Sequence, residues 1–531
     1  MSNERMLLSG NEAVALGAMH AGCALGIGYP GTPSTEILEN FSKLEQCRAQ
    51  WSPNEKVALE VGIGVAYAGT RALVTMKHVG LNVAADPLFT VAYTGVTGGL
   101  VLAVADDPGM ASSQNEQDSR NYARAAGIPM LEPADSQEAY DMARLAFGIS
   151  ERWNQPVILR LCTRVCHSKT VVTASAALEV PPASYVRSIK ERVMIPAYAR
   201  PAHKIMRRKL AGIEAWNCEE GPNPIFGSGS RLGIITNGVS AFHALEAVPD
   251  AKVMKVGMTY PLPMKAMLEF IDSVDECVVI EEGDPFIQTE VLAAGGKVRP
   301  RLERYRYGEL DVVRVRRIID GDDTDEPAPP PGKPPQLCEG CPHRASFEML
   351  KGLGCIITGD IGCYTLSVLP PFETMDTCVC MGASIGVGLG MRHVLPEEQA
   401  RKVVSVIGDS TFMHSGLTGV ADMVYNRPPT GHLIVILDNG TTAMTGLQEH
   451  PGTGRTLNHQ PAHKTVSIED TCRAMGVDNV VILDPSRELD AFEKAARDAL
   501  ASDDLTIIIA RRPCILAVVR DARLERGEKV R

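Results

Sequence analysis

Two polar segments, each directly after an apolar run, carry the most specific chemical pattern in the sequence. The run 403–407 is followed by Gly408-Asp409-Ser410, and about 30 residues later the run 433–437 is followed by Asp438-Asn439. One right-handed βαβ crossover has this length, so Asp409 and Asn439 are expected side by side at the carboxyl edge of neighbouring parallel strands. Their oxygen atoms, beside a helix N-terminus, suit Mg²⁺ that carries a diphosphate. A bare Gly-Asp also marks ordinary turns, which is the alternative interpretation.

The cysteines form a second pattern with chemical content. Six of the 14 cysteines lie within 43 positions, and Cys338-Glu339-Gly340-Cys341 among them is a C-x-x-C motif. Such a motif occurs in zinc sites, redox disulfides and metal clusters. Fourteen cysteines are too few for a disulfide scaffold in a chain of this length, and the N-terminus has no secretion signal, which indicates a reducing, cytoplasmic location. We therefore expect a metal or cluster site that draws on Cys338, Cys341, Cys355, Cys363, Cys378 and Cys380.

The overall composition is that of a globular enzyme with several domains. The chain has 531 residues, of which 45% are hydrophobic and 22% charged, and its net charge is −11. This composition excludes a disordered or fibrous chain, and the negative charge argues against binding to nucleic acids or anionic membranes. The longest uncharged run, 87–105, contains proline and several glycines, so we expect a buried strand–loop–strand there and no membrane insertion.

Apolar runs bounded by glycine or proline alternate with helical segments along most of the chain, a rhythm typical of βαβ units. It predicts an α/β fold with parallel sheets and three α/β domains. The rhythm weakens after residue 180, resumes near residue 228 and is interrupted by an acidic, proline-rich stretch that cannot pack. The expected parts are a first domain (1–180), a connector (181–227), a smaller domain (228–320), a linker (321–336), a third domain (337–520) and a tail (521–531).

The Gly-Asp segment and the later asparagine resemble the thiamine diphosphate signature, Gly-Asp-Gly followed about 30 residues later by Asn. Ser410 replaces the third glycine, which leaves the metal ligand in place. Nearly the whole chain resembles the large (alpha) subunit of the indolepyruvate ferredoxin oxidoreductase family. The matching strings are residues 28–34, 51–60, 76–87, 112–118, 337–344, 359–364, 407–417, 438–446 and 450–454.

The resemblance implies a fold and an activity. It implies a pyrimidine-type thiamine-binding domain over 1–180, a transketolase C-terminal-like domain over 228–320 and a diphosphate-type thiamine-binding domain over 337–520. The implied reaction is the oxidative decarboxylation of an aryl 2-oxoacid such as indolepyruvate to an acyl-CoA and CO2, with coenzyme A as cosubstrate. Thiamine diphosphate, Mg²⁺ and a [4Fe–4S] cluster are the implied cofactors. A non-oxidative thiamine-dependent 2-oxoacid decarboxylase is the alternative.

The resemblance also implies which residues hold the cofactors. Mg²⁺ would be held by Asp409, Asn439 and the backbone oxygen of Thr441. Met444 stands where the related pyruvate enzymes carry an amide side chain, which favours a larger, apolar substrate. A zinc site would use as many ligands as the cluster, but zinc cannot accept an electron. The residues implied around thiamine diphosphate are Glu60, Gly408, Asp409, Ser410, Asn439, Thr441 and Met444, and those around the cluster are Cys338, Cys341, Cys363 and Cys514.

Glu60 is the residue that we expect to act on the thiamine ring. A carboxylate against N1′ of the aminopyrimidine is needed before the C2 proton can be removed. Glu60 stands at the position that the family uses, and its neighbours on a helix are largely apolar or small, which favours burial. The alternatives are a surface-helix role for Glu60 and a catalytic role for Glu55 in its place.

Two further catalytic candidates lie in the first domain. Thr32, in the turn Pro30-Gly31-Thr32-Pro33, stands where the related pyruvate enzymes place a hydroxyl near the substrate, and its alternative role is to cap a helix. His78 belongs to a polar cluster with Lys77 and Asn82 just beyond a strand. These residues either position the substrate or satisfy loop carbonyl groups.

The resemblance also predicts partners. The family binds thiamine diphosphate between two domains, usually across a dimer, and includes a small beta subunit, so we expect a homodimer that needs a second polypeptide. Members usually continue into a ferredoxin-like domain with two cysteine-rich runs, whereas this sequence has no cysteine after Cys514. Either this sequence is shortened or the electrons leave through another subunit, and the expected acceptor is ferredoxin or another electron-transfer subunit.

Overall fold

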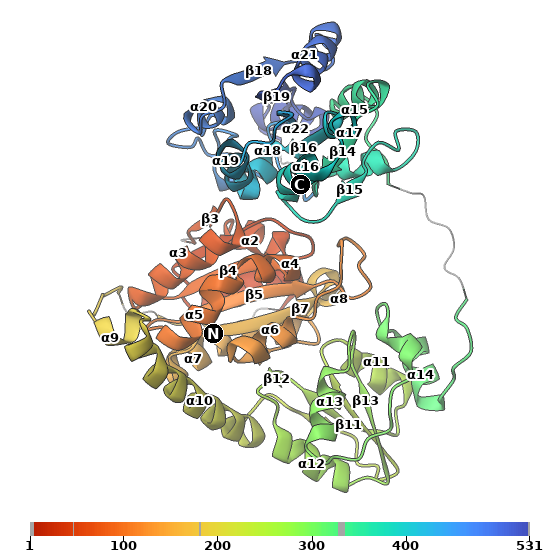
Figure 1. Ribbon diagram of the computed structural model, residues 1–531. Coiled ribbons are helices and arrows are strands. Elements are labelled where there is room, and N and C mark those ends of the chain that lie inside the picture. The colour runs from red at the N-terminus through yellow and green to blue at the C-terminus, as the bar shows by residue number, and fades with distance from the viewer. Residues whose placement is uncertain (1–4, 46, 180–181, 328–334, 529–531) are drawn as a thin grey trace. The chain divides into compact units, whose positions relative to one another are not determined.

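The computed structural model describes residues 5–45, 47–179, 182–327 and 335–528. The chain forms two compact units, Met1–Pro327 and Ala328–Arg531, which are described separately (Figure 1). The boundary falls in the proline-rich segment 321–336, of which residues 328–334 lie outside the described part. The same holds for residues 180–181, where the first domain is expected to end, and for the last three residues of the expected tail.

A seven-stranded sheet forms the centre of the first unit. Its order is β12-β6-β7-β5-β4-β2-β3, and all neighbours are parallel except β12 and β6. All residues of β4, β5 and β7 are buried, as expected for parallel strands that helices cover on both faces (Figure 1). The strands are β2 (Leu25–Gly28), β3 (Ala49–Trp51), β4 (Ala72–Lys77), β5 (Leu100–Asp106), β6 (Met130–Leu131), β7 (Val157–Cys162) and β12 (Met258–Tyr260).

Short helices follow these strands. The helices are α1 (Gly10–His20), α2 (Thr35–Phe41), α3 (Glu55–Tyr67), α4 (His78–Val83), α5 (Ala85–Thr94), α6 (Ser119–Ala126), α7 (Ser136–Trp153) and α8 (Thr163–His167). The prediction of strand–loop–strand for 87–105 is wrong in its first half, because α5 occupies Ala85–Thr94. Pro87 lies in the first turn of α5, where no intrahelical partner for its missing N–H is needed. An antiparallel pair, β1 (Arg5–Ser9) and β8 (Lys169–Thr173), completes this domain.

The expected connector, residues 181–227, is mostly helical. It contains α9 (Ile189–Arg192), α10 (Pro196–Glu219) and β9 (Ile225–Phe226). The buried residues of α10 are spaced three or four apart, so one stripe of the helix packs against the unit, and α5 and α12 are among its neighbours. They are Met206, Leu210, Ile213 and Asn217.

The remainder of the first unit is a smaller α/β domain around a four-stranded sheet of order β13-β10-β11-β9. The strand β12, which follows β11 in the chain, belongs to the first sheet instead, where it pairs with β6. Buried ion pairs join the two domains further, since Arg120 Nη1 lies 2.5 Å from Glu281 Oε2. The elements are β10 (Leu232–Asn237), β11 (Lys252–Val256), β13 (Glu276–Ile280), α11 (Ser240–Ala247), α12 (Met264–Asp272), α13 (Phe286–Ala293), a 3-10 turn (Glu303–Arg306) and α14 (Val312–Asp320).

The second unit is built on a six-stranded, fully parallel sheet of order β15-β14-β16-β17-β19-β18. Its strands are β14 (Ile356–Gly359), β15 (Thr377–Cys378), β16 (Val403–Gly408), β17 (His432–Asp438), β18 (Asn479–Leu483) and β19 (Leu505–Arg511). Its helices are α15 (His343–Gly352), α16 (Ala383–Val394), α17 (Glu397–Ala400), α18 (Asp409–Thr411), α19 (Leu417–Tyr425), α20 (Ile468–Ala474), α21 (Leu489–Ala501) and α22 (Ile515–Glu525). Short 3-10 turns cover Cys363–Val368 and Leu457–His459.

These sheets confirm the predicted fold class, α/β with parallel sheets. The described part of the chain contains no helix that is both long and apolar enough to cross a membrane.

Candidate functional site

The carboxyl edge of the second sheet gathers the residues that the sequence singles out. The strands β14, β16, β17 and β19 are direct neighbours in the sheet. Asp409 follows β16 and Asn439 follows β17, and Gly408 is paired with Leu437 in the parallel register. The N–H of Gly440 donates to Oδ2 of Asp409 at 2.7 Å. The prediction that Asp409 and Asn439 emerge side by side is therefore confirmed.

Asp409 is a buried carboxylate with a side-chain exposure of only about 3%. Burial by itself would raise its pKa, but His450 at 3.2 Å and hydrogen bonds from the N–H groups of Ser410 and Gly440 outweigh burial and lower the pKa. The carboxylate is therefore ionised at neutral pH. Directly after it, residues Phe412–Gly416 form a π-helical turn, a distortion that is frequent at functional sites.

Asn439 is held from three sides. Its Oδ1 accepts from the N–H of Thr441 at 3.1 Å, and its Nδ2 lies 3.2 Å from Nε2 of His343. Its backbone oxygen accepts from the N–H of Cys514 at 2.9 Å. Burial lowers the pKa of His343 to about 4, against an opposing effect of Asp409, so this imidazole is neutral at physiological pH.

The other expected cofactor contacts lie in the same loops. The hydroxyl of Ser410 lies 2.7 Å from that of Thr442, so the residue that replaces glycine ties the β16 loop to the β17 loop. Thr441 is buried, and its hydroxyl donates to the backbone oxygen of Gln448 at 3.1 Å. Met444 is 47% exposed, so its side chain is available to a ligand or partner.

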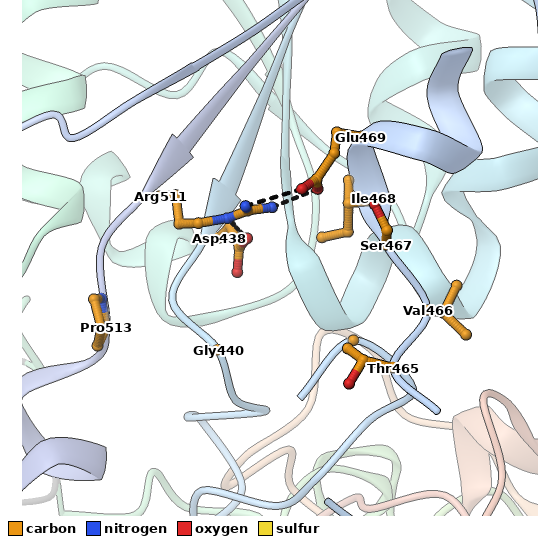
Figure 2. Close-up of a pocket in the computed structure, with 10 residues that line it drawn as sticks. Asp438, Gly440, Thr465, Val466, Ser467, Ile468, Glu469, Arg511 and Pro513 are labelled. Atoms are coloured by element: carbon orange, nitrogen blue, oxygen red, sulfur yellow. Dashed lines mark hydrogen bonds and ion pairs between the residues drawn. The ribbon is translucent and has the colours of Figure 1, made fainter. Parts of the chain in front are cut away.

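A cavity of about 330 Å³ adjoins Gly440 and Gly452 (Figure 2). Arg511 lies in its wall between two carboxylates, with Nε 2.7 Å from Asp438 and Nη2 2.6 Å from Glu469. Arg511 lowers the pKa of Glu469 to about 2, whereas burial and the charge of Asp409 raise the pKa of Asp438. The arginine thus clamps the ends of β17 and β19 to the start of α20.

The cysteines separate into two groups. The pKa of Cys363 is raised to about 12, first by burial and then by the negative charges of Cys341, Cys514 and Cys338. The pKa of Cys341 is raised to about 11 by burial and then by Cys338 and Cys514. Cys341 and Cys363 thus each interact electrostatically with Cys338 and Cys514, although Cys514 is far from the others in sequence.

The remaining cysteines of the 338–380 segment have other neighbours. Cys378 and Cys380 interact with each other and with Asp360, and Cys355 interacts with Arg392. Among the described residues, no group of three or more His, Cys, Asp or Glu side chains is already placed to hold a metal ion.

A second polar cluster lies at the carboxyl edge of the first sheet. Nζ of Lys77, at the end of β4, donates to the backbone oxygen of Ser112 at 2.7 Å. Burial lowers the pKa of Lys77 to about 8, against the opposing charge of Asp107. The hydroxyl of Ser112 in turn donates to the backbone oxygen of Thr32 at 3.4 Å. Thr32 and Lys77 thus share one edge of the sheet.

His78 and Asn82 differ in their surroundings. His78 is fully buried, and its Nε2 lies 3.2 Å from the backbone oxygen of Asn115. Burial lowers the pKa of His78. Asn82 is exposed and accepts from Tyr122 at 3.1 Å. The alternative role of Thr32 as a helix cap is wrong, because α2 begins at Thr35 and its cap position is Ser34.

The expected burial of Glu60 is also wrong. Glu60 lies on the outer face of α3, its side chain is 45% exposed, and it forms an ion pair with Lys56 one turn earlier. Glu55, the alternative acid, is only 5% exposed and lies in the first turn of α3. Its Cγ and Oε1 lie so close to Gly80 that a Cβ there would come within 2.6 Å of them. Of the two acids, only Glu55 faces the interior at the edge of the sheet.

Sequence reasoning missed several residues that the structure brings to these edges. His343 and His450 contact the two expected metal ligands, and Asp107 and Ser112 surround Lys77. A signal was present, since His343 follows the C-x-x-C motif by two residues and Asp107 follows the apolar run of β5.

Comparison with known proteins agrees with this geometry. The family "Thiamine pyrophosphate enzyme, C-terminal TPP binding domain" matches residues 360–510, in the second unit. The family "Pyruvate flavodoxin/ferredoxin oxidoreductase, thiamine diP-bdg" matches residues 16–214, in the first. Indolepyruvate oxidoreductase subunit IorA of Archaeoglobus fulgidus is 39% identical over 98% of this chain and 88% of its own length. The chain belongs to the IorA family.

Another IorA protein, from Pyrococcus abyssi, is 38% identical over 99% of this chain and 88% of its own length. Ketoisovalerate oxidoreductase subunit VorB of Methanothermobacter marburgensis is 28% identical over 60% of this chain. IorA membership confirms the expected family, and with it the alpha subunit of a 2-oxoacid:ferredoxin oxidoreductase. A solved 2-oxoglutarate:ferredoxin oxidoreductase from Magnetococcus marinus covers 56% of this chain with a TM-score of 0.47 and 15% identity.

Proposed function

We propose that this chain is the thiamine diphosphate-binding subunit of an enzyme that oxidatively decarboxylates an aryl 2-oxoacid, such as indolepyruvate, to an acyl-CoA and CO2. Electrons pass through a [4Fe–4S] cluster to a ferredoxin or another electron-transfer subunit. The observation that carries the proposal is the juxtaposition of Asp409 and Asn439 at one sheet edge, inside a matched thiamine-binding domain. When bound, thiamine diphosphate supplies the nucleophilic carbon and the electron sink for decarboxylation.

The residues at the second sheet fit Mg²⁺ and a diphosphate. Asp409 is ionised although it is buried, a state that a bound cation would compensate. With Oδ1 of Asn439 and the backbone oxygen of Thr441 it would give Mg²⁺ the hard oxygen ligands that this ion prefers. His450 and the N–H groups of Ser410 and Gly440 keep the Asp409 side chain in one orientation.

We assign the acid that acts on the aminopyrimidine ring to Glu55 instead of Glu60. The helix α3 follows β3, so its first turn lies at the carboxyl edge of the first sheet, where Lys77 and Thr32 also lie. Glu55 is buried in this turn, whereas Glu60 points outward and is paired with Lys56. From this position Glu55 would exchange a proton with N1′ of the ring.

Lys77 is the proposed partner of the substrate carboxylate. Lys77 is buried, and its Nζ donates to the backbone oxygen and to the hydroxyl oxygen of Ser112. A pKa of about 8 keeps most of the amine protonated at pH 7, so it provides a cation at the edge that also holds Thr32. Met444, which is exposed, is the proposed contact for the apolar part of the substrate.

Cys338, Cys341, Cys363 and Cys514 are the proposed cluster ligands. Cys341 and Cys363 each interact electrostatically with Cys338 and Cys514, which supports this set over a cluster built from neighbours in sequence. Four thiolates match the four irons of a cubane, and an iron cluster, unlike zinc, accepts single electrons.

Exposed glycines support a homodimer. Gly64 of α3 and Gly386 and Gly390 of α16 lie inside helices, and a Cβ at any of them would meet no atom within 4 Å in the single chain. A glycine inside a helix lowers the stability of the helix by about 1 kcal/mol relative to alanine. Close packing of these helices against a second copy of the chain would explain why glycine stands at these positions. The family's small beta subunit is the second expected partner.

Anaerobic preparation of the native complex tests the proposed function. We expect four irons and one thiamine diphosphate per chain as the family's cofactors imply, absorbance near 400 nm, and acyl-CoA formed from the 2-oxoacid only with coenzyme A and an electron acceptor. Asp409→Ala should abolish Mg²⁺-dependent cofactor binding in calorimetry. Release of an aldehyde without an electron acceptor, from iron-free protein, would instead favour the non-oxidative decarboxylase.

A further inference from the structure

His343 connects the cysteine segment to the loop of Asn439. It is the first residue of α15 and follows Cys341 by two positions. Its side chain is buried, with its ring edge-on to Tyr364, the residue after Cys363, at a centroid distance of 6.3 Å. Its Nε2 lies 3.2 Å from Nδ2 of Asn439. One imidazole therefore contacts the segments that carry Cys363 and a proposed metal ligand.

The hydrogen bonds around Asn439 define the orientation of its amide. Thr441 donates its N–H to Oδ1, and when the His343 ring proton is on Nδ1, the bare Nε2 accepts from the amide nitrogen of Asn439. If the amide were flipped, its N–H₂ group would face the N–H of Thr441 and its oxygen would face the lone pair of His343. In this tautomer both contacts would become repulsive, so Thr441 and His343 specify the same orientation of the amide.

We propose that His343 is a positioning residue for the magnesium site, which holds the Asn439 amide so that its oxygen stays on the side of Thr441. This proposal rests on the proposed function, in which Asn439 and Thr441 are ligands. Residues that orient a metal ligand through a hydrogen bond typically contribute a factor of about 10–100 to metal affinity. His343 does not touch the cation itself.

Calorimetric titration of Mg²⁺ into the full chain, with thiamine diphosphate saturating, tests the proposal. His343→Met removes the acceptor and should weaken Mg²⁺ binding by about 10–100-fold. His343→Gln keeps an acceptor at similar reach and should retain most of the affinity. His203→Met, at an exposed position of α10, is the control and should have no effect. Equal affinity of His343→Met and wild type, or a Gln variant as weak as the Met variant, would overturn the proposal.

A double-mutant cycle separates orientation from packing. Asn439→Asp keeps an oxygen ligand but has no N–H to donate, so the loss caused by His343→Met should disappear in this background. Persistence of the full loss would mean that His343 acts only through packing, contrary to the proposal.

A measurement on the wild-type protein covers the case in which the Met variant does not fold. In ¹⁵N spectra of histidine-labelled protein, His343 should carry its proton on Nδ1 and have a bare Nε2; the opposite tautomer would overturn the proposal. If wild type bound no Mg²⁺ with the cofactor, the proposed function would fail as well, whereas tight wild-type binding unchanged in His343→Met would refute the positioning role alone.

Discussion

At the scale of single residues, substitutions of Glu55 and Glu60 in α3 can be compared directly. They are five positions apart, but Glu55 is buried at the sheet edge and Glu60 is exposed. Glu55→Gln should leave the cofactor bound and slow hydrogen–deuterium exchange at C2 of thiamine diphosphate by at least about 100-fold, since an amide cannot take the N1′ proton. Glu60→Gln should exchange at nearly the wild-type rate. The reverse result, measured by NMR after acid quench, would restore Glu60 to the role.

Cys514 provides a second residue-scale test. Its backbone N–H donates to the oxygen of Asn439, and this contact does not need the thiol, so Cys514→Ala should keep cofactor binding. Loss of the fourth thiolate should convert the cluster to a [3Fe–4S] form or release it, as followed by electron paramagnetic resonance. Cys472→Ala, at a buried cysteine of α20, is the control and should keep the cluster. A full cubane in Cys514→Ala, with loss in Cys355→Ala, would contradict the ligand set.

Part of this site could be predicted from residue order alone. Asp409 and Asn439 directly follow apolar strands, and the parallel register then places them together. The predicted burial of Glu60 is wrong because apolar neighbours in sequence do not tell which face of a helix the rest of the chain covers. His343 was missed because its contact with Asn439 spans 96 residues and depends on where α15 lies.

At the scale of elements, Arg511 clamps β17 and β19 to α20 through Asp438 and Glu469. The pKa of Glu469 is lowered to about 2 from an ordinary value near 4.5, so this ion pair stabilises the fold above pH 4.5 and is lost as the pH falls toward 2. Glu469→Gln should therefore lower the melting temperature at pH 7 and have a smaller effect near pH 3. Thermal unfolding at pH 7 and near pH 3 measures these changes in melting temperature.

Glu493→Gln, in an exposed ion pair of α21, is the control and should change the melting temperature little at either pH. An effect of Glu469→Gln that did not shrink in acid would contradict the clamp.

A second prediction at this scale concerns the helix α16 and the formation of the homodimer. Gly386→Leu introduces no clash within one chain, because nothing lies within 4 Å of its Cβ position, and should by propensity stabilise the helix. If α16 packs against a second copy, the same change should convert the dimer to a monomer, as measured by light scattering. Ala491→Leu, at an exposed position of α21, is the control. A dimer unchanged by Gly386→Leu would exclude α16 from the interface.

Most elements could be predicted from the alternation of apolar runs, and the exceptions have physical reasons. The strands β4, β5, β16, β17 and β19 are buried on both faces and read as continuous apolar runs. The segment of helix α5 is predicted as a strand because a short buried helix has the same composition as a buried strand.

At the scale of the whole molecule, the chain combines two thiamine-type α/β domains in separate units with a smaller domain attached to the first. The sequence predicted the three α/β regions, but not that β12 crosses from the smaller domain to the first sheet. A pairing of two or three residues leaves no sequence pattern, because it depends on tertiary contacts such as the Arg120–Glu281 ion pair.

The central claim is that this chain takes electrons from a 2-oxoacid at a thiamine site and passes them to its own cluster. The most direct measurement is the absorbance near 400 nm of the anaerobic, reconstituted complex after it is mixed with indolepyruvate, without an external acceptor. We predict bleaching of the cluster band within the enzyme's turnover time in wild type, and none in Asp409→Ala. An oxidised cluster that stays unbleached in wild type while indolepyruvate is consumed would contradict the account.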